Sequence, residues 1–249
     1  MSYGVALVTG ASRGIGRAIA LRLAVDGYDI VLNDLPVEKE NLNSVAEEIM
    51  KLGRRVLECI ADVTKEDQVI HMIEKVEEIF EGLDVMVANA GICIPRPFLE
   101  STSEDWDRSF DVNGKGVYLC YKHAAKQMIK QGRGGRIIGA CSLAGKQGRP
   151  LLSIYSATKF VVRSLTESAA IELGKYGITV NAYAPGFVNT PLMDQYVQDT
   201  KKWGGTDALY QSVVSGEEVA ALVSYLVSKD AKNITGQSIN INGHSQVFG

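Results

Sequence analysis

The sequence predicts an α/β fold in which a doubly wound parallel sheet of seven strands is flanked by helices. Short runs rich in valine and isoleucine alternate along the chain with longer segments of helical period. This pattern is typical of a parallel sheet covered by helices on both faces. Successive runs lie about 25 to 50 residues apart, which fits a series of strand–helix–strand units.

The predicted elements follow this alternation from one end of the chain to the other. The apolar runs predict strands at residues 5–9, 29–33, 55–60, 85–88, 136–141, 179–183 and 238–241. The segments between them predict helices at residues 15–26, 38–52, 65–80, 104–131, 152–176 and 217–228. Side-chain oxygens favour the start of a helix, so Thr64 and Ser103 are the expected caps of the third and fourth helices.

Residues 1–249 are expected to form a single domain, because no Pro/Ser-rich linker, change of composition or internal repeat divides them. Residues 190–216 are the irregular part of the pattern, with Pro191, the pair Gly204-Gly205 and little periodicity. A stretch of this kind late in an α/β chain is expected to be a lid over a binding site. The alternative is a surface excursion that takes no part in catalysis.

The composition excludes several classes of partner. The 249 residues are 46% hydrophobic, and their net charge is -3 without any long basic run, so no nucleic-acid partner is expected. No apolar run approaches the roughly 18 residues of a membrane span, and the first residues lack the basic and apolar regions expected of a signal peptide. We therefore expect a soluble, cytoplasmic protein. Four cysteines without a CxxC pair and three histidines predict neither a metal site nor a disulfide framework.

A glycine-rich turn follows the first predicted strand and opens the first predicted helix. Gly10 permits the tight turn, Gly14 lets the backbone approach a ligand, and Gly16 lets the helix pack close to the strand. Main-chain amides and the positive end of a helix can receive a pyrophosphate, so the turn predicts a dinucleotide cofactor. A merely structural turn is the alternative. The residues expected to contact the cofactor here are Gly10, Ser12, Arg13, Gly14, Ile15 and Gly16.

Asp34, after the second predicted strand, favours NAD over NADP. It lies 18 residues after Gly16, where a carboxylate can hold the ribose 2'-hydroxyl and would repel a 2'-phosphate. Arg13 argues the other way, because a guanidinium in the turn could pair with such a phosphate. NAD is the expected cofactor and NADP the second choice. For Asp34 itself, the alternative is a plain turn aspartate before Leu35-Pro36.

Further motifs, taken with the glycine turn, carry a resemblance to a known family. They are Thr9-Gly10-x3-Gly14-x-Gly16, Asp62-Val63, Asn89-Ala90-Gly91, Asn113, Ser142, Tyr155-Ser-Ala-Thr-Lys159 and Pro185-Gly186 with Thr190. Over essentially its whole length the chain resembles the classical short-chain dehydrogenases/reductases, nearest the diacetyl/acetoin reductase and 2,3-butanediol dehydrogenase branch. The resemblance implies a Rossmann-type single domain, a nicotinamide cofactor, and hydride transfer to or from a carbonyl/alcohol pair. It also implies a homotetramer or homodimer, with the helices at 104–131 and 152–176 forming subunit contacts.

The resemblance assigns cofactor contacts beyond the glycine turn. Asp62 would bond the adenine ring, Asn89 would support the strand beside the cofactor, and Val188 and Thr190 would face the carboxamide. The cofactor-binding residues that it implies are Asp34, Asp62, Val63, Asn89, Gly91, Tyr155, Lys159, Pro185, Gly186, Val188 and Thr190. Asn113 would hold a water that links the lysine to solvent. The small residues Gly114 and Gly116 could instead admit a neighbouring helix or subunit.

Ser142, Tyr155 and Lys159 are the expected catalytic residues, together with Asn113. Tyr155 and Lys159 are four residues apart, so both side chains rise from one face of a helix. A phenol with a pKa of about 10 is a poor base, but an adjacent ammonium and an oxidised nicotinamide both favour its anion. Tyr155 is therefore the expected general acid/base. Ser142, at the carboxyl end of the fifth predicted strand, is expected to hold the substrate oxygen beside the phenol.

The residues around Tyr155 point to a small hydroxyketone, diketone or polyol as substrate. In the resembled branch Gln147 would bond a second oxygen next to the reacting carbonyl, so the expected substrate contacts are Ser142, Gln147 and Tyr155. The first hypothesis is an NAD-dependent alcohol dehydrogenase/ketone reductase. An NADPH-dependent 3-oxoacyl or secondary-metabolite ketoreductase is the rival. A nucleotide-sensing or structural protein without turnover is the alternative from another class.

Overall fold

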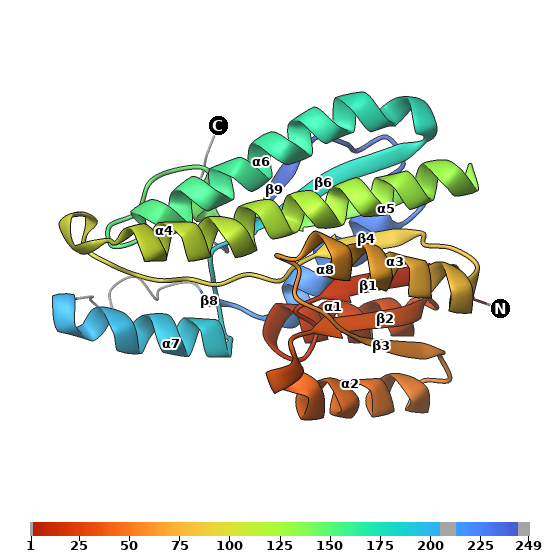
Figure 1. Cartoon of the computed structure of the whole chain (residues 1–249), viewed down its shortest axis with the longest axis horizontal. Coiled ribbons are helices and arrows are strands. Elements are labelled where there is room, and N and C mark those ends of the chain that lie inside the picture. The colour runs from red at the N-terminus through yellow and green to blue at the C-terminus, as the bar shows by residue number, and fades with distance from the viewer. Residues whose placement is uncertain (1, 205–212, 244–249) are drawn as a thin grey trace.

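Seven parallel strands form the central sheet of the computed structural model, which describes residues 2–204 and 213–243 (Figure 1). The strands are β1 (Val5–Thr9), β2 (Asp29–Asp34), β3 (Val56–Ile60), β4 (Val85–Ala88), β5 (Gly135–Ala140), β6 (Ile178–Pro185) and β9 (Ser238–Ile241). Their order across the sheet is β3-β2-β1-β4-β5-β6-β9, and each neighbouring pair is parallel. The predicted fold class is confirmed, and each predicted strand matches one of these strands to within two residues at either end.

Helices cover both faces of the sheet. They are α1 (Gly14–Val25), α2 (Lys39–Lys51), α3 (Glu66–Phe80), α4 (Ser103–Phe110), α5 (Val117–Gln131), α6 (Ser153–Leu173), α7 (Pro191–Thr200) and α8 (Gly216–Val227). Val5 and Leu7 of β1 pack in a core with α3, α5 and α6, whereas Ala6 and Val8 pack in a second core with α1, α2 and α8. Burial of both faces explains the strongly apolar strands. Among the described residues, no helix is both long and apolar enough to traverse a bilayer.

The segment predicted as one helix, residues 104–131, is interrupted by a π-helical segment. α4 ends at Phe110, a π-helix occupies Asp111–Gly116, and α5 continues from Val117. The wider turn places Asn113 in the interior, with 0% of its surface exposed. Such π segments are rare in proteins, and those that occur are often found at functional sites. The irregularity therefore marks the part of this long helical segment that carries a site residue.

Both expected caps of these helices are wrong by one residue. The N-cap position of α3 is held by Lys65 rather than Thr64, and its side chain makes no cap bond. The N-cap of α4 is Thr102 rather than Ser103, and its hydroxyl accepts a hydrogen bond from the Asp105 N–H at 3.1 Å. Residue type alone favours Thr64 over Lys65 and Ser103 over Thr102, so the path of the backbone decides which residue takes the cap position.

Residues 190–216 contain more regular structure than the sequence indicated. α7 lies at the start of this segment, and β8 (Val213–Val214), near its end, pairs in parallel with β7 (Phe187–Val188), which lies just before the segment. Thr190 caps α7 by accepting a hydrogen bond from the Met193 N–H at 3.3 Å, and Pro191 takes the first helical position. Residues 205–212 of the predicted lid lie outside the described residues. In Figure 1, α7 lies beyond the end of the sheet opposite the N-terminus.

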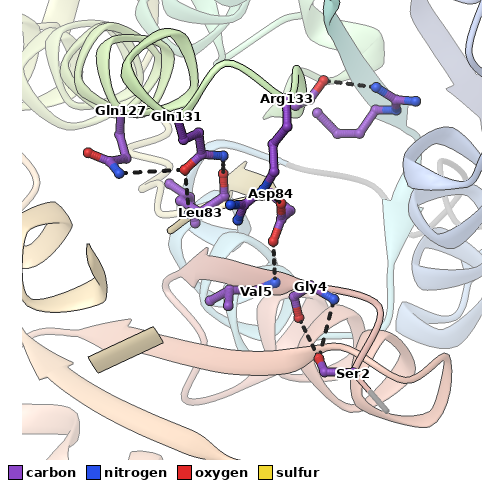
Figure 2. A network of polar contacts seen from close by, with 10 residues as sticks. Ser2, Gly4, Val5, Leu83, Asp84, Gln127, Gln131 and Arg133 are labelled. Carbon is purple, nitrogen blue, oxygen red and sulfur yellow. Dashed lines mark hydrogen bonds and ion pairs between the residues drawn. The ribbon is translucent and has the colours of Figure 1, made fainter. Parts of the chain in front are cut away.

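The amino ends of the central strands are tied together by polar side chains, as Figure 2 shows. Asp84, one residue before β4, accepts hydrogen bonds from the Val5 N–H at 2.8 Å and from the Arg133 guanidinium at 2.8 Å. Gln131 binds both main-chain groups of Leu83, donating to its oxygen at 2.6 Å and accepting from its nitrogen at 3.0 Å. This edge of the sheet is therefore closed by hydrogen bonds among its own residues.

Candidate active site

The carboxyl ends of the strands border a cleft of about 910 Å³. β1 lies between β2 and β4, so the strand order reverses at β1 and the loops after β1 and β4 diverge. Open α/β sheets bind ligands in the crevice at such a switch point. The wall of the cleft is formed by the loops after β1, β2, β3 and β4, together with parts of α4, α6 and α7.

The glycine-rich turn has the backbone that its sequence predicts. Gly10 and Gly14 have φ angles of 62° and 55°, in the left-handed region that favours glycine. A Cβ on Gly16 would overlap the carbonyl oxygen of Gly10, so α1 packs against the turn too closely for any side chain. The first residues of α1 line the cleft, and amides of a first helical turn have no partner within their helix. This cradle fits a pyrophosphate.

Asn89, directly after β4, holds the glycine turn against the sheet. Its Nδ2 donates to the carbonyl oxygens of Thr9 at 2.7 Å and Gly10 at 3.1 Å, and its Oδ1 accepts from the Tyr183 hydroxyl at 2.7 Å. The Thr9 hydroxyl accepts from the N–H groups of Asn89 and Ala90, each at 3.0 Å. The turn and the loop after β4 are thus one hydrogen-bonded unit in the wall of the cleft.

Two carboxylates lie at the part of the cleft beside the end of β2. Asp34 accepts from the main-chain N–H of Ser12 at 3.1 Å and from that of Leu35 at 2.9 Å. Glu38 lies 3.1 Å from the Arg13 guanidinium, and its other carboxylate oxygen accepts from the Ser12 hydroxyl at 3.4 Å. Sequence reasoning missed Glu38, because an acid at a helix start is already explained by the helix dipole. Its place four residues after Asp34 is the signal that could have found it.

Tyr155 and Lys159 lie on one face of a helix, as their spacing predicts, and Ser142 lies beside Tyr155. Tyr155 and Lys159 project from α6, with the Lys159 Nζ 5.4 Å from the centre of the Tyr155 ring. The hydroxyl groups of Tyr155 and Ser142 are hydrogen-bonded to each other. Lys159 is 3% exposed, and its Nζ donates to the carbonyl oxygen of Ala140 at 2.8 Å. A phenol, an alcohol and an amine therefore converge where β5 ends beside α6.

Burial determines the protonation of these groups. It raises the pKa of Tyr155 well above its ordinary value, an effect increased by the nearby Cys93 and opposed by the hydrogen bond with Ser142. Burial lowers the pKa of Lys159 from 10.5 to about 8. At pH 7 the phenol keeps its proton and most of the amine is charged. The arrangement can give a proton to an oxygen atom that binds beside Tyr155.

Asn113 connects the π-helical segment to the loop after β4. Its Oδ1 accepts from the Ile92 N–H at 2.9 Å, and its Nδ2 donates to the Ile92 oxygen at 2.8 Å and to the Thr158 hydroxyl at 3.1 Å. A Cβ on Gly91 would lie 3.2 Å from the Asn113 Oδ1 and 3.6 Å from the Lys159 Nζ. Asn113 and Lys159 therefore flank the same glycine.

Most of the expected site residues line the cleft. They are Gly10, Arg13, Gly14, Ile15, Gly16, Asp34, Asp62, Val63, Asn89, Gly91, Tyr155, Lys159, Pro185 and Thr190. The other expected residues do not belong to its described wall, and they are Ser12, Asn113, Ser142, Gln147, Gly186 and Val188. Ser12, Asn113 and Ser142 still hydrogen-bond to residues of the wall. Gln147 is not brought to the wall of the described cleft, and its N–H donates to the Leu143 oxygen at 3.2 Å.

The cleft also has a charged rim that sequence reasoning missed. It is lined from α4 and the start of the π-helix by Glu104, Asp107, Arg108 and Asp111. Their spacing of three, one and three residues places them on one helical face, which is the signal that could have found them. The segment predicted as a lid also lines the cleft, through Leu192 and Gln195 of α7.

Comparison with known proteins agrees with this geometry. The family model of short chain dehydrogenases matches residues 4–201. A short-chain dehydrogenase/reductase of Armillaria gallica is 52% identical over 246 residues, which are 96% of this chain and 94% of that protein. A 3-oxoacyl-[acyl-carrier-protein] reductase of Staphylococcus aureus is 42% identical, over 96% of both proteins.

Solved structures show the same likeness over nearly the whole chain. The acetoin dehydrogenase of Salmonella typhimurium is 32% identical, with a TM-score of 0.85, over 98% of this chain and 96% of that one. A short chain dehydrogenase of Mycobacterium paratuberculosis bound to NAD is 30% identical, with a TM-score of 0.89, over 96% of both chains. The chain belongs to the short-chain dehydrogenase/reductase family and is an oxidoreductase with a dinucleotide-binding Rossmann-type fold.

Proposed function

We propose that this chain is an NAD(H)-dependent oxidoreductase that interconverts a ketone and a secondary alcohol. The observation that carries the proposal is the hydrogen bond between the Tyr155 and Ser142 hydroxyls, with Lys159 5.4 Å from the phenol ring, beside a glycine-rich turn in the same cleft. Three side chains arranged in this way can hold a carbonyl oxygen and give it a proton.

The residues present fit a dinucleotide. The left-handed Gly10 and Gly14 and the start of α1 would hold its pyrophosphate, and Asp34 would hold the adenosine ribose. Asp62, which the resemblance assigns to the adenine ring, and Thr190, which it assigns to the carboxamide with Val188, both line the cleft. The nicotinamide, when bound, supplies the hydride in reduction and takes it in oxidation.

The proton path follows from the protonation of the side chains. When a ketone is reduced, the Tyr155 hydroxyl would give its proton to the carbonyl oxygen that Ser142 would hold. In oxidation, the phenol takes the alcohol proton back. The charged Lys159 stabilises the phenolate that forms, and Asn113 lies across Gly91 from the Lys159 amine, where a water could join the two. After reduction Tyr155 is a phenolate, which is the form that oxidation requires. After oxidation it carries the proton that reduction requires.

Three side chains support NAD rather than NADP. Asp34 accepts from the Ser12 N–H, so a carboxylate lies at the place expected for the ribose 2' position. A 2'-phosphate would be repelled there. Arg13, which could attract that phosphate, is already paired with Glu38 at 3.1 Å. The NAD-bound relative from Mycobacterium paratuberculosis is in keeping with this preference.

A small hydroxyketone, diketone or polyol is the proposed substrate. The similarity to an acetoin dehydrogenase supports it, at 32% identity over 98% of the chain. Three carboxylates and one guanidinium on the rim provided by α4 also support it, because the phosphate of a carrier-bound substrate would meet net negative charge there. The 42% identity with a 3-oxoacyl-[acyl-carrier-protein] reductase favours the second candidate, an NADPH-dependent 3-oxoacyl ketoreductase.

Initial rates at 340 nm test both candidates. Acetoin, diacetyl and a 3-oxoacyl thioester are each reduced with NADH and with NADPH, and the reverse reaction is followed with 2,3-butanediol. We expect turnover of the small ketones with a preference for NADH. A tenfold preference for NADPH, or turnover confined to the thioester, would establish the second candidate instead.

Residues 190–216 are proposed to act as a lid. Leu192 and Gln195 of α7 line the cleft, and the Trp203 indole N–H donates to the Glu100 carboxylate at 3.3 Å. The Arg96 guanidinium lies 5.7 Å from the centre of the Trp203 ring. These contacts attach the lid to the loop before α4.

The chain is also proposed to form homodimers or homotetramers through the predicted helices 104–131 and 152–176. Large apolar side chains on these helices support the proposal, because Phe160 and Ile171 of α6 and Ile129 of α5 are exposed in the single chain. Sedimentation at micromolar concentration is expected to give a dimer or tetramer. Sedimentation as a monomer alone would refute it.

A further inference from the structure

An ion pair in the wall of the cleft joins the glycine turn to the start of α2. The Arg13 guanidinium is 3.1 Å from the Glu38 carboxylate, and the side chain of Arg13 is 60% exposed whereas that of Glu38 is 14% exposed. Glu38 also accepts from the Asn41 amide at 2.8 Å and from the Ser12 hydroxyl at 3.4 Å. The carboxylate is therefore held by three groups, and the arginine is the more exposed partner.

We propose that Glu38 is a second coenzyme-discriminating residue, which keeps the Arg13 guanidinium engaged and so withholds it from the 2'-phosphate of NADP(H). The inference rests on the proposed preference for NAD. A guanidinium binds a carboxylate and a phosphate with the same two-pronged geometry, so one partner excludes the other. Arg13 lines the cleft within one residue of Ser12, which bonds both Asp34 and Glu38. It is thus placed where a phosphate on the ribose would arrive.

Asp34 and Glu38 therefore act in different ways. Asp34 is expected to touch the ribose, so its loss weakens NAD as well as changing the preference. Glu38 acts through Arg13 and does not need to touch NAD at all. Its removal is expected to leave NAD binding nearly unchanged and to free the guanidinium for a phosphate. A charge-assisted hydrogen bond of this kind corresponds to about tenfold to hundredfold in affinity.

Calorimetric titration of the purified full chain tests this without any turnover. The probes are 5'-AMP and 2',5'-ADP, which differ by the 2'-phosphate alone, followed by NAD+ and NADP+. Glu38→Gln is expected to bind 2',5'-ADP and NADP+ at least tenfold more tightly than the wild type, and 5'-AMP within about twofold. Arg13→Ala in the Glu38→Gln background is expected to remove that gain. The glutamine keeps hydrogen-bonding groups for Asn41 and Ser12, so the start of α2 is preserved.

Glu48→Gln is the matched control. Glu48 pairs with Arg17 at 2.7 Å between α1 and α2, the helices that follow Arg13 and Glu38, and neither residue lines the cleft described. Its loss is expected to leave all four affinities unchanged. Arg13→Ala alone is a second test that keeps Glu38 in place, and it is expected to leave the affinity for 2',5'-ADP unchanged, because the guanidinium is already engaged.

Three outcomes would overturn the inference: no gain in Glu38→Gln, a gain that survives the loss of Arg13, or a tenfold loss of 2',5'-ADP affinity in Arg13→Ala alone. The proposed function is tested separately by the wild type. A wild-type protein that binds NADP+ tenfold more tightly than NAD+ contradicts the proposed cofactor, whereas the change on substitution reports on Glu38.

Discussion

The two edges of the sheet use their polar residues in opposite ways. At the amino ends of the strands, the charge of Asp84 is neutralised by Arg133 and by a main-chain N–H, and the main-chain groups of Leu83 are both paired. At the carboxyl ends, Lys159 is buried beside a neutral carbonyl oxygen, and the first amides of α1 face a cleft. One edge satisfies its polar groups internally, and the other keeps them for a ligand.

This difference teaches how a parallel sheet separates stability from chemistry. All strands run in one direction, so every loop that leaves a carboxyl end reaches the same side of the molecule. Groups gathered there can remain incompletely paired, because a ligand completes them. The opposite edge and the two cores then supply the stability that these incompletely paired groups do not. Removing a paired charge at the amino edge should therefore lower the stability of the fold, whereas removing a buried charge at the carboxyl edge should raise it. The effects on activity should also be unequal.

Removal of the Tyr155 hydroxyl is the largest perturbation of the carboxyl edge. Tyr155→Phe is expected to lower kcat about 10³-fold, because a general acid/base contributes roughly 10² to 10⁴ to the rate. The melting temperature and NAD+ binding should remain close to those of the wild type. Initial rates, thermal denaturation and calorimetry measure the three. Tyr176→Phe, at an exposed tyrosine beyond the end of α6, is the control. An unchanged rate in Tyr155→Phe would favour a protein without turnover.

Removal of the Asp84 carboxylate is the corresponding perturbation of the amino edge. Asp84→Ala leaves the buried Val5 N–H without its acceptor and breaks the pair with Arg133, so the free energy of unfolding should fall by about 2 to 3 kcal/mol. Urea denaturation measures this. Asp84→Asn keeps an acceptor for Val5 and should cost about 1 kcal/mol or less. If Asp84→Ala denatures at the same urea concentration as the wild type, the amino edge does not have its proposed role.

Lys159→Met should change stability in the opposite direction. The pKa of Lys159 is about 8 in the folded protein and 10.5 ordinarily, so the unfolded chain binds more protons and burial of the charge destabilises the fold below pH 8. That penalty is about 3 kcal/mol, and loss of the bond to the Ala140 oxygen offsets about half of it. We expect the variant to be about 1 to 2 kcal/mol more stable at pH 7.

The pH dependence distinguishes this explanation from better apolar packing. The wild type gains stability relative to Lys159→Met as the pH rises from about 8 to 10.5, because the lysine loses its proton in the folded state first. Denaturation of both proteins at pH 7 and at pH 10 measures the difference. A gain that is equal at the two pH values would show that the buried charge is not its cause.

The smallest expected effect concerns the lid. Trp203→Phe removes the hydrogen bond to Glu100, so KM for the ketone should rise about three- to tenfold, consistent with the loss of a single hydrogen bond, while kcat changes less. Steady-state kinetics measure both constants. Trp106→Phe is the control, because Trp106 stacks on Phe110 within α4 at 4.2 Å rather than joining the lid to the loop before α4. An unchanged KM in Trp203→Phe would indicate that residues 190–216 are a surface excursion.

Much of the fold could be predicted because its signals are local or strictly spaced. The strand runs such as Val5–Thr9 are apolar on both faces, and the glycines at 10, 14 and 16 have no other explanation as good as a tight turn. Tyr155 and Lys159 are on one helix, so their separation already determines their common face. The convergence of Ser142 with Tyr155 depended on the resemblance and on the rule that ligands bind at carboxyl ends.

The remaining features depend on contacts between distant segments. Glu38 is an ordinary acid at a helix start until β2, which pairs with β1, brings it back to Arg13, 25 residues earlier. α7 has a start signal in Thr190 and Pro191, but its mixed residues form no clear apolar stripe because the described helix is largely exposed. The predicted contact of Gln147 required the path of the loop after β5, which spacing alone does not determine.

The π-helical segment determines how the face of α5 is rotated about the helix axis relative to the face of α4. Each residue advances an α-helix by about 100°, so one extra residue within a turn rotates the next helix by that amount relative to the one before. α4 can therefore present its acidic face to the mouth of the cleft while α5 presents its apolar face to the sheet. Deleting one residue between Asp111 and Gly116 would bring the two faces into a single phase, although the helix itself would be more regular.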